Sequence, residues 1–387
     1  MRIEDTDRER SKQEYLDEIL DSMTWLGLEW DDLYKQSERF AIYARHAQKL
    51  LDEGKAYKDG AAVVLTMPKT EIRFFDMIRG EVSFDTEIIK DQVLMKSDGS
   101  PTYAFACVVD DALMEISHVI RGEDHISNTP KQIAIYQALG FNVPKFAHVP
   151  LIMDEEGGRM SKRSGATAVT EYRRMGFLPE ALVNYLMLLG WSPGGDQEMI
   201  TLKSAIKKFS VKRINKSAAA FSLNKLRWFN AQYIKHKDDQ ALADFMTPLL
   251  LERKAISKNF NPDTLKKIIG LYKNRMADLQ EFLERTDYVI NEEWTLDPEI
   301  KTRLKGDEVV RYFGGLAGDL EGLKGFDRSS AEQAFRAFAE HNGIKTAGLV
   351  HPVRVALTGS DVGPGLFETM EVLGQKRTVE RLRSIAA

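Results

Sequence analysis

The sequence changes character near residue 169, and this change limits the folds that the chain can adopt. Before it, short apolar runs typical of strands alternate with segments of helical spacing. After it helical spacing prevails, as in residues 176–191 (GFLPEALVNYLMLLGW). We therefore expect an α/β domain followed by an all-α region, and 387 residues suffice for two or three domains.

The α/β part opens with a predicted strand and helix. Residues 2–7 (RIEDTD) are typical of a short strand that leads into a helix capped by Thr6 or Asp7. A second helix is predicted where residues 41–57 show helical spacing that stops at Gly54. Between residues 61 and 96, apolar and polar residues alternate in segments separated by Pro, Gly and Asp, which predicts a small β-rich insertion.

Residues 103–124 predict two buried parallel strands. The apolar runs ACVV and ISHVI end in charged residues, at Asp110-Asp111 and at 121–124 (RGED). Ligands bind at the carboxyl ends of such strands in open α/β sheets, so these charges are site candidates. A helix is predicted at 128–140, with Pro130 in its first turn and Gly140 at its end.

The remaining elements are separated by glycine and proline. A strand, a Gly-Gly hairpin turn and a basic loop are predicted at 148–169, and helices after them. From about residue 237, we expect the helices to be separated by Pro262, Pro298, Gly314-Gly315 and residues 363–365 (GPG).

Composition excludes several classes of protein. The single cysteine, Cys107, rules out an internal disulfide and a cysteine-based zinc cluster. No apolar run approaches the roughly 20 residues of a membrane helix, and the polar N-terminus is no signal peptide, so we expect a cytoplasmic protein without membrane contact. The net charge of −4 argues against a broad nucleic-acid binder. Residues 202–216, with six Lys/Arg and no acid, form either a solvated helix face or a local phosphate contact.

A basic loop at residues 159–163 is a candidate for phosphate binding. Arg159, Lys162 and Arg163 supply cations, and Ser161 supplies a hydroxyl, in a segment flanked by glycine. Preorganised cations stabilise the charge that develops on a polyphosphate. A surface turn rich in Lys and Arg has the same composition, so the pentapeptide alone leaves both interpretations open.

Three other residues predict a pocket for an α-amino acid. Arg121 offers a guanidinium suited to a carboxylate, Glu4 offers an anion for an ammonium group, and Tyr103 offers a phenol between them. A structural ion pair at Arg121 and a packed tyrosine would explain the same residues. Together with a phosphate-binding loop, the pocket predicts activation of a carboxylate by a nucleoside triphosphate.

The order of these motifs resembles that of the bacterial-type glutamyl-tRNA synthetases, which are class I aminoacyl-tRNA synthetases. Segments similar to those of the family cover nearly the whole chain in family order: RIEDTDRERS (2–11), GLEWDD (27–32), RGEVSFD (79–85), SDGSPTYAFACVVDD (97–111), VIRGEDHISNTPKQIAIYQALG (119–140), RMSKRSGA (159–166), GFLPEALVNYLMLLGW (176–191), KLRWFNAQYI (225–234) and HPVRVALTG (351–359).

The resemblance implies an organisation for the whole chain. Residues 1–56 and 100–153 would form a Rossmann-like class I synthetase catalytic domain that is N-terminally incomplete. Residues 57–99 would be a shortened α+β connective insertion that binds the acceptor end of tRNA. An all-α part would follow, with a stem-contact region at 154–236 that includes the Lys-Met-Ser-Lys-Ser-type loop and an anticodon-binding domain at 237–387.

The resemblance also implies roles for single residues. Lys162, assisted by Arg159 and Ser161, would stabilise the ATP phosphates, with Met160 and Arg163 in the same ATP site. Glutamate would be held by Glu4, Tyr103 and Arg121, with Arg121 on the substrate carboxylate, and by Cys107 at a position where some members have an asparagine facing the substrate. The implied tRNA contacts are Arg8, Arg10, Lys207, Lys208, Lys212 and Arg213.

The implied reaction forms glutamyl-adenylate from L-glutamate and ATP with Mg²⁺, then transfers the glutamyl group to the 3′ end of tRNA(Glu). We expect no zinc, because the insertion lacks the cysteine cluster found in many members, and we expect a monomer. The family's first strand and its His-x-Gly signature would precede residue 2, and no His-x-Gly occurs in the chain. We therefore expect a glutamate–tRNA ligase that lacks its N-terminal ATP-binding segment; the alternative is a catalytically inactive tRNA-binding paralogue.

Overall fold

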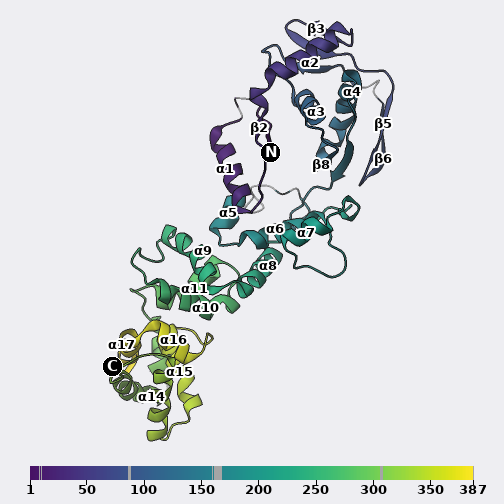
Figure 1. Cartoon of the computed structure of the whole chain (residues 1–387). Helices are drawn as coiled ribbons and strands as arrows, with labels where there is room; N and C mark the ends of the chain where they lie inside the picture. The colour runs from purple at the N-terminus through teal and green to yellow at the C-terminus, as the bar shows by residue number, and fades with distance from the viewer. Residues whose placement is uncertain are drawn as a thin grey trace. The chain divides into compact units, whose positions relative to one another are not determined.

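The chain forms two compact units in the computed structural model. The first comprises Met1–Tyr172 and Pro179–Phe229, and the second comprises Arg173–Leu178 and Asn230–Ala387 (Figure 1). The structure describes residues 1–7, 9, 11–85, 89–158, 160, 168–305 and 308–386, with the backbone alone at Val309. Within these residues, none of the helices has both the length and the apolar character that crossing a membrane requires.

The strands described in the first unit form three sheets. A parallel pair consists of β1 (Arg2–Ile3) and β2 (Tyr34–Lys35). An antiparallel sheet has the order β3 (Ala56–Asp59), β4 (Ala62–Leu65) and β7 (Gln92–Met95). The largest sheet has the order β6 (Gly80–Asp85), β5 (Glu71–Asp76), β9 (Lys145–Val149) and β8 (His118–Gly122).

The predicted β-rich insertion is present, but its strands are divided between two sheets. The hairpin of β5 and β6 extends the sheet of β9 and β8, because the end of β5 pairs in parallel with β9 at Asp76 and Phe146. The backbone N–H of Met77 donates to the Phe146 carbonyl at 2.9 Å and continues this pairing. The turn of the hairpin therefore lies beside a strand of the α/β domain.

Three helices pack together into the core of the first unit: α2 (Phe40–Asp52), α3 (Tyr103–Leu113) and α4 (Thr129–Leu139) (Figure 1). Their fully buried side chains include Leu50, Phe105 and Ile133. The prediction for α4 is confirmed, since Pro130 lies in its first turn and Gly140 ends it with a φ of 74°. The unit's other helical segments are α1 (Gln13–Trp25), η1 (Gln36–Glu38), η3 (Glu123–Asn128), α5 (Val169–Arg174), α6 (Pro179–Gly190), α7 (Leu202–Lys208), η4 (Val211–Arg213) and α8 (Leu223–His236).

One of the two predicted parallel strands is wrong. Residues 118–120 of the ISHVI run belong to β8, but the ACVV run lies inside helix α3. Residues 105–110 of this helix are all buried, so the sequence shows a continuous apolar run without the polar face that identifies a surface helix. The β-branched Val108 and Val109 favoured a strand, and tertiary packing overrides that preference.

The predicted cap of the first helix is also wrong. Helix α1 begins at Gln13, with Lys12 as its N-cap, and neither Thr6 nor Asp7 caps it. The acidic residues after β1 contact other segments instead: the Asp5 carboxylate accepts hydrogen bonds from the backbone N–H and the hydroxyl of Ser37, at 2.8 and 2.6 Å. The acidic residues before the helix predicted a side-chain cap. In the structure, Asp5 accepts hydrogen bonds from Ser37 instead.

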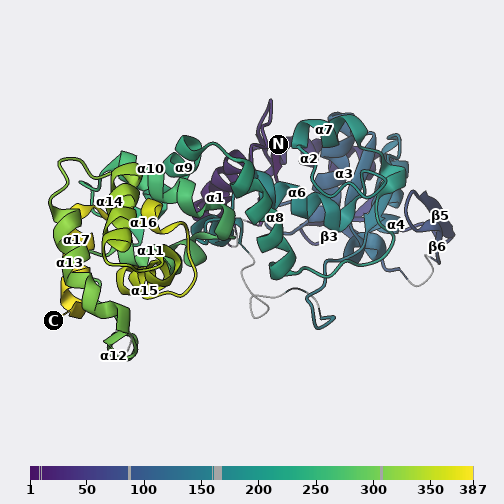
Figure 2. The same ribbon diagram turned by 90° about the horizontal axis from the view of Figure 1, so that it is seen from below.

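The second unit is helical, as predicted (Figure 2). Pro262 and Pro298 begin helices, but Gly314 and Gly315 lie within one rather than between two. An added Cβ at Gly315 would lie 3.0 Å from the Phe338 ring, so a larger residue there would have to displace that ring slightly. The helices after α8 are α9 (Asp239–Glu252), α10 (Pro262–Tyr272), η5 (Lys273–Arg275), α11 (Leu279–Ile290), α12 (Pro298–Lys305), η6 (Glu308–Tyr312), α13 (Phe313–Glu321), α14 (Arg328–His341), α15 (Thr346–Thr358), α16 (Leu366–Leu373) and α17 (Gln375–Ala386).

Gly176→Ala is expected to lower the free energy of unfolding of the second unit by about 3 kcal/mol. Gly176 has a φ of 84°, and an added Cβ would lie 2.5 Å from the Leu279 Cβ and 2.9 Å from its backbone nitrogen. Gly343→Ala is the matched control, because Gly343 has a φ of 66° but nothing within 4 Å of the added atom. Urea denaturation followed by circular dichroism measures both, and equal losses for the two variants would contradict the prediction.

Candidate active site

A cavity of about 780 Å³ in the first unit collects all four side chains predicted to hold glutamate. Glu4 follows β1, Tyr103 and Cys107 lie on α3, and Arg121 lies on β8. On α3, Tyr103, Cys107 and Asp111 are four residues apart, so their side chains form one stripe of the helix toward the cavity. Residues far apart in the sequence thus meet at one site.

The acidic wall of the cavity is centred on Glu4. Its Oε1 accepts hydrogen bonds from the Arg2 Nη2 at 3.1 Å and from the Cys107 Sγ at 3.2 Å. Arg2 also donates from Nη1 to Asp111 at 2.6 Å. Burial, with the nearby Glu4 charge, raises the pKa of Cys107, so the thiol stays protonated and acts as a donor. Among the described residues, the Oε2 of Glu4 has no hydrogen-bond partner, and it can accept one from a ligand.

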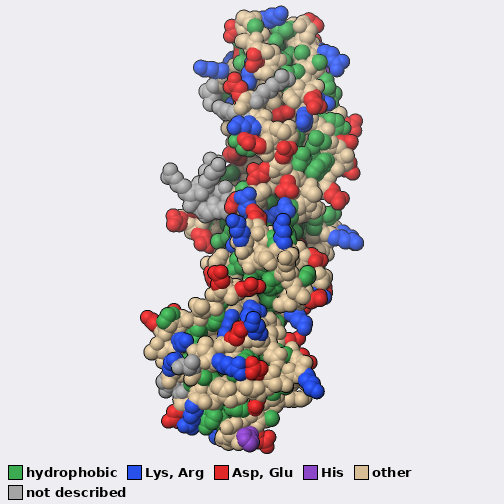
Figure 3. Space-filling view, turned by 90° about the vertical axis from the view of Figure 1, so that its left-hand side faces the viewer, with side chains coloured by type: hydrophobic (Ala, Val, Ile, Leu, Met, Phe, Trp, Pro, Cys, Tyr) green, Lys and Arg blue, Asp and Glu red, His purple; other side chains and the backbone are tan. Residues whose placement is uncertain are grey.

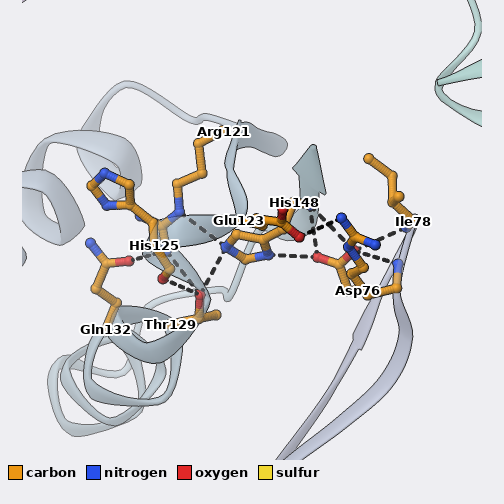
Figure 4. Close-up of polar contacts among 9 residues, drawn as sticks. Asp76, Ile78, Arg121, Glu123, His125, Thr129, Gln132 and His148 are labelled. Atoms are coloured by element: carbon orange, nitrogen blue, oxygen red, sulfur yellow. Dashed lines mark hydrogen bonds and ion pairs between the residues drawn. The ribbon is translucent and has the colours of Figure 1, made fainter. Parts of the chain in front are cut away.

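The basic wall of the cavity is Arg121, which is fixed by buried acceptors (Figure 4). Its Nε donates to the His148 Nε2 at 3.2 Å. Its Nη2 donates to the Thr129 hydroxyl at 2.9 Å and to the Gln132 carbonyl oxygen at 2.7 Å. The guanidinium also lies 5.6 Å from the centroid of the Phe146 ring. We infer that the site binds a ligand with a cationic and an anionic group.

His148 and Asp76 are part of this arrangement, and the sequence analysis missed both. Each is fully buried, and the His148 Nδ1 lies 2.7 Å from the Asp76 Oδ2 (Figure 4). Asp76 also accepts hydrogen bonds from the backbone N–H groups of Ile78 and Arg79, at 3.0 and 2.8 Å. The sequence offers one indication of this site, a lone histidine within the apolar run of β9. It does not reveal which residue this histidine contacts.

Tyr103 lies between the two walls. Its hydroxyl is 3.5 Å from the Nδ1 of His125, another residue that the sequence analysis did not single out. Burial, with the neighbouring Cys107 and Glu4, raises the pKa of Tyr103, so the phenol is neutral and can donate to a ligand.

Four residues of the predicted phosphate-binding loop lie outside the described residues: Arg159, Ser161, Lys162 and Arg163. Met160 is described and is half-buried. The predicted glycine turn before the loop is present, since Gly157 has a φ of 84° and the Asp154 carboxylate accepts from the Gly158 N–H at 2.7 Å. The predicted tRNA contacts Arg8 and Arg10 also lie outside the described residues.

The basic stretch 202–216 forms α7 and η4. Lys207 and Lys208 lie in the last turn of α7, and Lys212 lies in η4. Lys208 donates to the Gln197 side chain at 2.7 Å, and Arg213 donates to the Pro193 carbonyl at 2.7 Å and so holds a loop. Figure 3 shows lysine and arginine interspersed with acidic side chains on the face that it draws.

A second cavity, of about 420 Å³, lies in the second unit. Its lining combines Arg275, Arg285 and Arg354 with the aromatic side chains of Tyr288 and Trp294. Arg285 is paired with Glu281 at 2.6 Å, whereas the Nε of Arg354 is buried without a hydrogen-bond partner in the structure.

No group of three or more His, Cys, Asp or Glu side chains is arranged to hold a metal ion in the part of the chain that the structure describes. The absence of zinc stays a prediction from the sequence.

Known proteins match the chain along its whole length. Residues 1–63 and 61–228 match the catalytic domain of class I tRNA synthetases (E and Q), and residues 240–386 match an anticodon binding domain. The glutamate–tRNA ligase of Nitratidesulfovibrio vulgaris is 40% identical over 429 aligned residues, which cover 100% of this chain and 91% of that protein. Glutamate–tRNA ligase 1 of Caldanaerobacter subterraneus subsp. tengcongensis is 37% identical over 429 residues, covering 99% of this chain and 89% of that protein.

A solved structure matches the fold. The crystal structure of a glutamate tRNA ligase from Elizabethkingia meningosepticum in complex with its amino acid superposes with a TM-score of 0.84 at 27% identity, covering 100% of this chain and 91% of that one. The two segments of the catalytic-domain match meet at residues 61–63, in the hairpin of β3 and β4.

Proposed function

Because the chain belongs to the class I tRNA synthetases for glutamate and glutamine, within their glutamate–tRNA ligase group, we propose that it acts as a glutamate–tRNA ligase. It would activate L-glutamate with ATP to glutamyl-adenylate and transfer the glutamyl group to the 3′ end of tRNA(Glu). The observation that carries the proposal is the cavity whose two walls present Glu4 and Arg121. A reaction of protein synthesis also supports the cytoplasmic location predicted from the sequence.

The charges of the cavity suit a zwitterionic substrate with an additional carboxylate. We assign the substrate ammonium to the Oε2 of Glu4, on the acidic wall, and to the Tyr103 hydroxyl, which lies between the two walls. Arg121 would receive a substrate carboxylate, because a guanidinium with a buried, fixed orientation loses little entropy when it binds. The Cys107 thiol donates to Glu4, so it would orient the Glu4 carboxylate rather than attack the substrate.

ATP and its Mg²⁺ would be held mainly by groups outside the described residues. We propose Lys162, with Arg159 and Ser161, for the ATP phosphates, and Met160 and Arg163 for the same site. The support is a loop of cations that follows the turn at Gly157. Mg²⁺ would arrive with ATP as the counter-ion of its phosphates.

For tRNA we propose several contact regions. Arg8 and Arg10 follow the acidic wall of the cavity in sequence, and Lys207, Lys208 and Lys212 lie on α7 and η4. Arg213 is the weakest of the predicted contacts, because its guanidinium is used to hold the loop at Pro193. The second cavity would contact tRNA through its arginine side chains, since guanidinium groups bind phosphates and base edges.

The proposed function is tested by three measurements on the full chain: L-glutamate binding by calorimetry, tRNA(Glu) binding, and pyrophosphate exchange with glutamate, ATP and tRNA. We expect L-glutamate and tRNA(Glu) to bind, and the exchange measurement decides between the ligase and the non-catalytic alternative. Binding of glutamate and tRNA without exchange would identify the non-catalytic tRNA-binding alternative. Failure to bind either ligand would contradict the proposal.

Arg354→Gln is expected to weaken tRNA(Glu) binding about tenfold, because it removes one of the cationic side chains that line the second cavity. Arg336→Gln is the control: this arginine is exposed on α14 and pairs with Glu332 at 2.7 Å. Filter binding of labelled tRNA measures both variants. If they bind equally well, Arg354 does not contact tRNA.

A further inference from the structure

We propose that Asp76 and His148 are positioning residues that fix the orientation of Arg121 and leave its Nη1 to meet a substrate carboxylate. This inference rests on the proposed function and extends it. Figure 4 shows the contacts that carry it, running from Gln132 and Thr129 through Arg121 and His148 to Asp76.

The first step is the use of the Arg121 nitrogens. Nε carries one proton, which goes to His148, and Nη2 carries two, which go to Thr129 and Gln132. Among the described residues, Nη1 is the one nitrogen of Arg121 without a protein partner. Arg121 lines the cavity, so the two protons of Nη1 remain for a ligand.

The second step is the protonation state of His148. Its Nε2 receives a hydrogen bond from Arg121, so this nitrogen must carry a lone pair. The proton of a neutral imidazole is then on Nδ1, where it is donated to Asp76 at 2.7 Å. Burial lowers the pKa of His148 despite the Asp76 carboxylate, which agrees with a neutral ring.

The third step is that Asp76 must be an acceptor at both oxygens. Oδ1 accepts from the N–H groups of Ile78 and Arg79, and Oδ2 accepts from the backbone N–H of His148 at 3.0 Å and from its ring. These contacts lower the pKa of Asp76 although burial opposes them, so the group is a carboxylate. An asparagine here would turn an N–H toward one pair of donors. If it faced the ring, His148 would change tautomer and present Nε2–H to the Nε–H of Arg121.

The network also predicts a pH dependence. The groups that face His148 are Asp76 from β5, Arg121 from β8, His125 from η3 and the hydroxyl of Thr129 from α4. Phe146 of its own strand stacks on the ring. A second proton on the ring would oppose Arg121. Because the pKa of His148 is lowered from 6.5, glutamate affinity is full at neutral pH and falls as the pH drops through that lower pKa.

The position of Asp76 extends the network beyond the pocket. Asp76 ends β5, so it belongs to the hairpin of the insertion rather than to the strands that carry Arg121 and His148. From the same turn, Arg79 pairs with Glu123, which follows β8, and donates to the Lys216 carbonyl at 3.0 Å. A displacement of the hairpin would therefore reach Arg121 through His148.

Three variants test the proposal, with L-glutamate affinity measured by calorimetry between acidic and neutral pH. Asp76→Asn should weaken binding about tenfold at neutral pH. His148→Gln keeps an acceptor for Arg121 but cannot gain a proton, so it should bind within about threefold of the wild type and lose the acidic decline. Asp98→Asn is the control, because Asp98 accepts the Ser100 N–H at 2.8 Å in a similar turn without a histidine.

Nitrogen NMR of histidine-labelled protein provides a readout that does not depend on variants. We expect His148 to be protonated at Nδ1 in the wild type, and at Nε2 in Asp76→Asn when the asparagine amide faces the ring. A wild-type ring protonated at Nε2 would overturn the proposal, as would unchanged affinity and pH dependence in both variants. A wild-type chain that binds no glutamate would instead contradict the proposed function, while the tautomer would still decide whether His148 is arranged as inferred.

Discussion

Asp110→Asn is expected to lower the free energy of unfolding of the first unit by about 4 kcal/mol. The Asp110 side chain is fully buried. Its Oδ1 accepts from the Arg39 Nε at 2.9 Å, and its Oδ2 accepts from the Tyr43 hydroxyl at 2.7 Å and the Gln36 side chain at 3.1 Å. An asparagine has one acceptor oxygen, so its amide would oppose one set of donors and leave the partly buried Arg39 without a counter-ion.

The loss matters for the site because Asp110 joins three elements. Gln36 comes from η1, Arg39 and Tyr43 lie at the start of α2, and Asp110 lies on α3, seven residues after Tyr103 and so beside the stripe that faces the cavity. Burial and the neighbouring carboxylate raise the pKa of Tyr43, so its hydroxyl remains a donor throughout the physiological range. Asp110 therefore fixes the helix that presents Tyr103 and Cys107.

Hydrogen exchange measured by mass spectrometry reports the loss locally. Peptides from α2 and α3 should exchange faster in Asp110→Asn, while peptides from the second unit keep wild-type rates. Asp52→Asn is the control, since Asp52 lies on the exposed side of α2 and accepts a hydrogen bond from Gln48. We expect it to change the unfolding free energy by less than about 0.5 kcal/mol. Equal protection of α3 in both variants would show that the buried contacts of Asp110 contribute little.

The elements that the sequence predicted correctly have local signals. Helix α4 begins at a proline and ends at a glycine in the left-handed conformation, and both features depend on the residue itself. The helical tail repeats its apolar positions over many turns, so a single contact cannot reverse the pattern. Helix α3 gives no such local signal. It has no polar face, and the side chains that surround it come from α2 and α4.

The candidate site shows the same distinction between local and distant information. Glu4 and Arg121 could be chosen from the sequence because a charge that follows a strand indicates a ligand. Asp76 and His148 are 72 residues apart and meet because β5 joins the sheet beside β9. No spacing in the sequence encodes that pairing, and the insertion was expected to be separate from the α/β domain.

Arg121→Gln is expected to weaken L-glutamate binding about 100-fold, because it removes a charge-assisted contact of about 3 kcal/mol. Glutamine can still bond to one of the three acceptors now served by Arg121, at His148, Thr129 or Gln132. It carries no charge for the substrate. Arg121→Lys should lose almost as much, since an ammonium cannot hold these acceptors and also extend a donor into the cavity.

A comparison of L-glutamate with L-glutamine as ligands shows which substrate carboxylate Arg121 contacts. If it binds the side-chain carboxylate, wild-type protein prefers L-glutamate to L-glutamine, and Arg121→Gln loses most of that preference. If it binds the α-carboxylate, both ligands weaken to the same extent. Arg73→Gln is the control, because Arg73 lies on β5 and its exposed guanidinium pairs with Glu71 away from the cavity. Wild-type affinity for both ligands in Arg121→Gln would show that the basic wall does not contact the substrate.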